Sequence, residues 1–66
     1  MSKWRVCLQY ADNLLAINGT KEESETNLAQ IKDHIRDCGF RDILELGSNI
    51  IVTFERLDYV YMEEVK

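Results

Sequence analysis

His34 and Cys38 lie four residues apart in a stretch with helical periodicity, so both side chains would share one helix face. With Cys7 they could supply three ligands to a zinc ion, and as a pair they could form a thiolate–imidazole couple. A zinc site needs a further ligand and nucleophilic catalysis needs an orienting group, and the sequence indicates neither. We expect a histidine beside a buried cysteine. A small metal or thiol protein built on His34, Cys38 and Cys7 is the third hypothesis for function.

The other residues able to do chemistry form no catalytic pattern. Acidic pairs occur at Glu22-Glu23 and Glu63-Glu64, but neither pair lies in the apolar context that general acid catalysis requires. The three glycines are isolated, so the sequence has no glycine-rich phosphate loop. We therefore expect no catalytic residues, no metal and no cofactor, and a protein that is not an enzyme.

Aromatic and basic residues in the second half of the chain indicate binding instead. Tyr59 and Tyr61 are two residues apart in a strand-like segment, so both rings should project from one face. Tyrosine and arginine are enriched at binding hot spots, and together they can stack on a base and clamp a phosphate. Arg41 and Arg56 adjoin predicted strands, which places both near a sheet end.

The elements that must position these residues begin with a strand. Apolar residues alternate with others from Trp4 to Tyr10, which predicts a strand with one apolar face. Asp12-Asn13 is a plausible turn, and residues 14–17 fit either a short returning strand or an apolar loop.

A helix should follow from about Lys21 to Cys38. Thr20 and Glu23 fit a capping box, in which each side chain accepts a hydrogen bond from the backbone of the other residue. Ser24 and Thr26 are alternative caps, which would move the helix start by about one turn. Gly39 is the expected residue after the helix C-terminus. Apolar residues between these signals recur at helical spacing, at Leu28, Ile31, Ile35 and Cys38.

The remaining segments predict a three-stranded meander of Ile43–Leu46, Ile50–Glu55 and Tyr59–Met62, separated by turns at residues 47–49 and 56–58. The order is β(β)αβββ in a single domain spanning residues 1–66. This is an α+β fold with one amphipathic helix packed on one face of a small, mainly antiparallel sheet. The expected core consists of Trp4, Val6, Leu8, Leu28, Ile31, Ile35, Leu44, Leu46, Ile50, Val52, Phe54, Val60 and Met62.

One helix covers only one face of a sheet, and the other face should be apolar. It would carry Ile43, Ile51, Thr53, Tyr59 and Tyr61. Exposed apolar patches of this kind mark interfaces. This face predicts either a symmetric homodimer, which we favour, or a partner or ligand surface; the two can coexist.

Composition limits the partners. Twelve acidic and eight basic residues give a formal net charge of −4, which argues against nucleic acid and anionic membrane partners. Two scattered cysteines and no apolar targeting segment favour a cytoplasmic location.

No motif identifies a family. In size, acidity and layout the chain resembles the small inhibitors encoded by phages and mobile elements, including anti-CRISPR and other anti-defence proteins, a resemblance of general character. It implies a non-enzymatic protein that docks on a larger protein partner and inhibits it. Acidic residues near the last turn and strand would face a basic partner surface, namely Glu55, Asp58, Glu63 and Glu64.

The alternative is a dimeric small-molecule binder that sequesters a nucleotide-like signal, because dimerisation can create pockets that 66 residues cannot enclose. Its pocket would be lined by Tyr59, Tyr61, Trp4, Arg41 and Arg56. The basic residues are scattered and outnumbered, which favours the protein partner.

Overall fold

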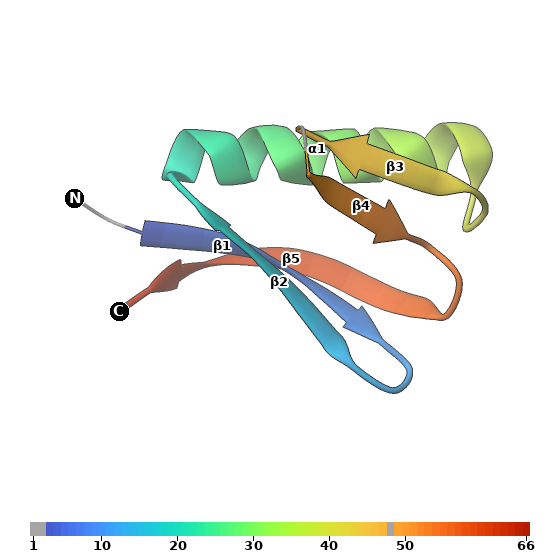
Figure 1. Cartoon of the computed structure of the whole chain (residues 1–66), viewed down its shortest axis with the longest axis horizontal. Helices are drawn as coiled ribbons and strands as arrows, with labels where there is room; N and C mark the ends of the chain where they lie inside the picture. Colours follow the sequence, from blue (N-terminus) through green and yellow to red (C-terminus); the bar gives the residue numbers. More distant parts are fainter. Residues whose placement is uncertain (1–2, 48) are drawn as a thin grey trace.

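The computed structural model describes residues 3–47 and 49–66, and within them the chain forms one helix and five strands. Figure 1 shows their arrangement. In chain order they are β1 (Lys3–Tyr10), β2 (Leu14–Gly19), α1 (Lys21–Cys38), β3 (Ile43–Leu46), β4 (Ile50–Thr53) and β5 (Leu57–Val65). The expected α+β fold, with a helix packed on a small antiparallel sheet, is confirmed. Residues 14–17, compatible with strand or loop, belong to a strand.

The strands form two antiparallel sheets. One has three strands in the order β2-β1-β5, and the other is the β3–β4 hairpin. The predicted meander is therefore wrong at its second step, because β5 pairs with β1 and not with β4. The predicted turn at residues 47–49 includes Ser48, which lies outside the described residues.

The turn after β4 explains why the chain leaves the hairpin. The Phe54 carbonyl accepts a hydrogen bond from Leu57 N–H at 3.2 Å, and Arg56 between them has a φ of 66°. The Arg56 carbonyl in turn accepts from Ala11 N–H at 2.9 Å, which ties this turn to the β1–β2 loop. β5 therefore begins beside the end of β1, and the two strands pair from Tyr10 back to Lys3.

Helix α1 has the bounds and caps that the sequence predicts. Thr20 Oγ1 accepts a hydrogen bond from Glu23 N–H at 3.1 Å, and Glu23 Oε1 accepts from Thr20 N–H at 2.8 Å. Both halves of the capping box are thus present. Gly39 follows the helix with a φ of 72°, and its N–H donates to the Ile35 carbonyl at 2.8 Å.

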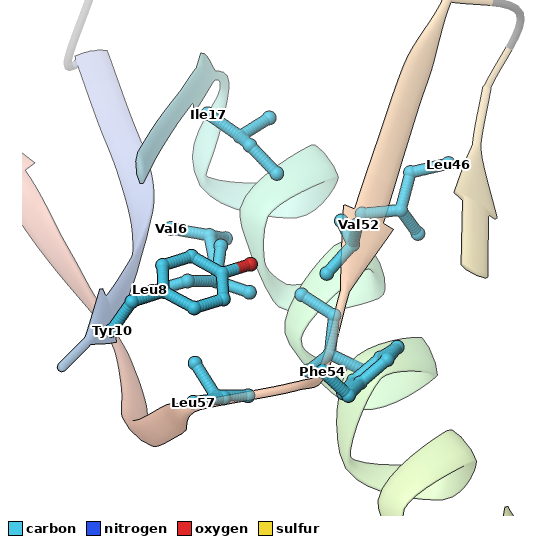
Figure 2. Close-up of a cluster of buried hydrophobic side chains, with 9 residues drawn as sticks. Val6, Leu8, Tyr10, Ile17, Leu46, Val52, Phe54 and Leu57 are labelled. Atoms are coloured by element: carbon cyan, nitrogen blue, oxygen red, sulfur yellow. The ribbon is translucent and has the colours of Figure 1, made fainter. Parts of the chain in front are cut away.

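The core lies between the three-stranded sheet and a layer made of α1 and the β3–β4 hairpin (Figure 1). In Figure 2, Val6, Leu8 and Tyr10 of β1 point toward Val52 of β4 and toward Phe54, which directly follows β4. The most deeply buried apolar side chains are Val6, Leu8, Ile31, Leu46, Val52 and Phe54, all predicted as core. Other predicted members pack at the rim, at Leu28, Ile35, Leu44, Ile50, Val60 and Met62.

Three residues of the buried core cluster were not predicted, and one predicted residue lies outside this cluster. Tyr10, Ile17 and Leu57 are buried because the β1–β2 hairpin and the start of β5 close the end of the core. The Tyr10 hydroxyl donates to the Thr53 carbonyl at 2.8 Å and so links the two sheets. Trp4 is only half-buried, at the opposite end of β1.

Candidate binding surface

The face of the three-stranded sheet directed away from α1 is the main uncovered surface, and we call it the outer face. Side chains alternate along each strand, so the residues between the core positions share this face. Across the sheet from β2 through β1 to β5, it consists of the rows Leu14–Gln9–Tyr59, Ala16–Cys7–Tyr61 and Asn18–Arg5–Glu63.

Tyr59 and Tyr61 form a stacked pair on the outer face. Their ring centroids are 5.7 Å apart with an interplanar angle of 27°, and the residues are 57% and 36% exposed. Leu14, in the same row as Tyr59, is 52% exposed. Tyrosine offers a large contact area with few rotatable bonds, so a stacked exposed pair loses little entropy on binding. The pair and Leu14 give this face an apolar, partly rigid region.

Cys7 occupies the centre of the outer face and is 1% exposed. Its Sγ lies 3.6 Å from Glu63 Oε1. Burial raises the pKa of the Cys7 thiol, and the side-chain hydrogen bond with Cys7 raises the pKa of Tyr61. A thiol with a raised pKa is a weak nucleophile near neutral pH, so we read Cys7 as a buried, unreactive side chain beside its cross-strand neighbour Tyr61.

Arg5 and Glu63 form an ion pair at one end of the outer face. Arg5 Nε donates to Glu63 Oε1 at 2.6 Å, and this hydrogen bond is the main reason that the pKa of Arg5 is raised. Glu63 is therefore neutralised within the chain and contributes little negative charge toward a partner. Among the ion pairs of the described residues, none involves the other acids proposed for a basic partner, which are Glu55, Asp58 and Glu64.

The predicted single face that joins hairpin residues to the tyrosines is wrong. Ile43 and Ile51 are 60% and 58% exposed, but with Thr53 they lie on the exposed side of the β3–β4 hairpin, a different sheet. The prediction assumed that β4 pairs with β5, which would have aligned Ile51 with the tyrosines. The outer face instead includes residues of β1 and β2 that were not predicted to belong to a binding surface.

Trp4, Arg41 and Arg56 also lie apart from the tyrosine pair. Trp4 is on the core side of β1, where Lys21 Nζ lies 5.6 Å from its ring centroid. Arg41 follows α1, and its carbonyl is 2.8 Å from His34 Nε2. Arg56 belongs to the turn that precedes β5. Within one chain, the five residues proposed for a nucleotide-like ligand therefore do not come together.

A shallow groove lies beside Trp4. It runs between the ends of β1 and β5 and the start of α1. Its charged lining residues are Lys3, Lys21, Glu22, Glu23 and Glu64. Because carboxylates outnumber amines there, the groove is poorly suited to a phosphate.

The fold separates Cys7 from His34 and Cys38, the two residues of α1 with which it was proposed to do metal or thiol chemistry. Cys7 is on the outer face, whereas the His34 ring stacks against buried Phe54 on the opposite side of the sheet. Within residues 3–47 and 49–66, no group of three His, Cys, Asp or Glu side chains is placed to hold a metal ion. The same residues include no helix long and apolar enough to cross a membrane.

Comparisons with known proteins identify no family for this chain. No family model, no curated protein sequence and no solved structure matches it. Its function must therefore be argued from the surface itself.

Proposed function

We propose that the protein is a non-enzymatic inhibitor that docks its outer face on a larger protein partner, as the small anti-defence proteins of phages and mobile elements do. The observation that carries this proposal is the exposed, stacked pair of Tyr59 and Tyr61 beside exposed Leu14. Tyrosines held on a sheet are suited to the centre of a protein interface, where they fill pockets and exclude water.

The surroundings of the pair favour a protein partner. Buried Cys7 is the cross-strand neighbour of Tyr61, and the Arg5–Glu63 ion pair leaves no unpaired charge at one end of the face. Glu55 and Asp58 lie near the other end, in and just after the turn into β5. A partner surface with an apolar pocket and a basic rim would complement this arrangement.

Sequestration of a nucleotide-like molecule has less support. Trp4 and the two tyrosines lie on opposite faces of the three-stranded sheet. Trp4 lines the groove at the start of α1, whereas Arg41 follows the other end of this helix. A phosphate site needs convergent cationic groups, and the two lysines of the groove, Lys3 and Lys21, are outnumbered by its three glutamates.

Affinity capture with matched surface variants tests the proposal. The tagged chain is used as wild type, as the double variant Tyr59→Ala/Tyr61→Ala, and as the control Ile43→Ala/Ile51→Ala, which removes exposed apolar area from the hairpin. Quantitative mass spectrometry should show one protein retained by wild type and control and lost from the tyrosine variant. Equal retention by the tyrosine variant would exclude the outer face as the docking surface. Unchanged thermal unfolding of both variants confirms that they are folded.

A further inference from the structure

Strand β2 has an unprotected edge. In the sheet order β2-β1-β5, one edge of β2 pairs with β1, and no strand within residues 3–47 and 49–66 pairs with the other. Its six residues, Leu14 to Gly19, include no charge and no proline. Free strand edges template pairing with another chain, and monomers commonly protect them with charges, prolines or bulges.

The β1–β2 hydrogen-bond pattern determines which backbone groups of β2 point to the open edge. Tyr10 N–H donates to the Asn13 carbonyl at 2.8 Å, so these two residues form a hydrogen-bonded pair. Antiparallel pairs alternate, so Leu15 and Ile17 direct their N–H and C=O groups toward β1. The N–H and C=O groups of the intervening residues point to the open edge, at Leu14, Ala16 and Asn18.

The opposite edge of the sheet is protected in the usual ways. β5 carries Asp58, Glu63 and Glu64, and its pairing with β1 is irregular where Tyr10 pairs with Leu57 and Gln9 with Tyr59. Asp58 is thus an extra residue that disrupts the ladder. The contrast between the two edges identifies β2 as the edge suited to pairing.

We propose that β2 pairs antiparallel with β2 of a second copy about a twofold axis at Ala16. In this register Ala16 faces Ala16, and Leu14 faces Asn18 of the second copy. All three open residues then form hydrogen-bonded pairs, and a shift by two residues in either direction leaves one of them unpaired. Leu15 meets Ile17 of the second copy on the core side, which extends the apolar inner face across the junction.

Charge supports a second copy at this edge. Each chain has a net charge of −4, so two copies repel one another at most approaches, and uncharged β2 adds no local repulsion. Beyond the strand, the same register brings Asp12 opposite Thr20 of the second copy. Asp12 would then lie near Lys21 of the second copy and near the positive N-terminal end of its helix α1, a favourable position for a carboxylate.

The dimer would join the outer faces of the two copies into one continuous surface. Leu14 and Ala16 would occupy its centre, and the tyrosine pairs of the two copies would flank it. Dimerisation uses the edge and partner docking uses the face, so this inference does not depend on the proposed function. Each can fail without the other, because the dimer is measured on the purified chain alone.

Sedimentation equilibrium across micromolar to millimolar concentrations tests the dimer. Wild type should show a reversible monomer–dimer equilibrium. Ala16→Pro removes only an N–H that points to the open edge, so the internal ladder is kept, and this variant should stay monomeric. Ala16→Thr keeps the N–H and should dimerise like wild type. A monomeric wild type at the highest concentration would overturn the proposal, and so would undiminished dimerisation of Ala16→Pro.

A charge-pair experiment tests the register and does not rely on proline. Ala16→Lys and Ala16→Glu each place like charges opposite one another on the axis, so each variant alone should dimerise about fivefold more weakly than wild type. An equimolar mixture of the two should recover dimer, because the heterodimer pairs lysine with glutamate. If the mixture behaves like the separate variants, Ala16 does not face Ala16 and the proposed register is wrong.

Discussion

The His34 ring stacks on Phe54, with centroids 4.2 Å apart and an interplanar angle of 12°. His34 Nε2 also lies 2.8 Å from the Arg41 carbonyl. A carbonyl only accepts, so Nε2 carries the hydrogen in this contact. His34 thus connects the end of α1 to the following loop and covers a fully buried aromatic ring. The contact gives the one histidine of the chain a structural role.

We expect His34→Ala to lower the free energy of unfolding by about 1–3 kcal/mol, because it removes the stacking contact and the hydrogen bond. Urea denaturation measures this loss, and Gln30→Ala, which changes an exposed position of the same helix, is the control. Added zinc should not change the melting temperature of the wild type. A His34→Ala variant of normal stability that loses bound zinc would favour the metal hypothesis instead.

Ser24→Ala should stabilise the protein. Ser24 is 1% exposed in the first part of α1, and its Oγ has no hydrogen-bond partner among the described residues. Removing a buried hydroxyl without a partner should raise the free energy of unfolding by about 1 kcal/mol, including the higher helix propensity of alanine. Thr26→Ala on the exposed side isolates the propensity contribution. If the two substitutions have equal effects in thermal unfolding, the buried hydroxyl carries no cost.

Arg56→Gly should also stabilise the protein, through the backbone. Arg56 has a φ of 66°, in the left-handed region that disfavours residues with a Cβ atom. Glycine should relieve this backbone strain, and the net gain in the free energy of unfolding should be roughly 0.5–1 kcal/mol after the greater entropy loss of glycine on folding is subtracted. Arg56→Ala removes the same side chain and keeps the strain, so it should give no gain. Equal stability of the two variants in urea denaturation would locate the effect in the side chain.

Cys7 should react far more slowly than Cys38 with iodoacetamide in the native protein. Cys7 is buried, its pKa is raised by burial, and Cys38 is partly exposed. The unfolded chain loses the Cys7 proton first as the pH rises, so this thiol should lower stability progressively above a pH of about 9. Peptide mass spectrometry over time measures both rates, and in denaturant they should converge. Equal rates in the native protein would show that the neighbouring side chains of the outer face do not shield Cys7 from solvent.

Features encoded locally could be predicted from the sequence. Thr20, Glu23 and Gly39 specify the helix ends through bonds within a few residues, and α1 has the predicted bounds. The alternation at Tyr59 and Tyr61 correctly places both rings on one face. These predictions succeeded because the interactions that determine them lie close in sequence.

Pairing between distant strands could not be predicted in the same way. β5 fits the local pattern of a third meander strand equally well, and the choice of β1 depends on the Ala11–Arg56 hydrogen bond and on core packing. This one pairing moves Ile43, Ile51 and Thr53 to a separate surface. Leu14 could have been found by extending the alternation of β1 across the hairpin into β2.

The most direct test of the proposed function is calorimetry with the partner protein that affinity capture identifies. Removing a hot-spot tyrosine costs on the order of 2 kcal/mol of binding free energy. We therefore expect Tyr59→Ala/Tyr61→Ala to raise the dissociation constant about a hundredfold or more. Ile43→Ala/Ile51→Ala should bind within about threefold of wild type, because surface changes outside an interface have small effects. Unchanged affinity of a folded tyrosine variant, or an equal loss in the hairpin variant, would contradict docking through the outer face.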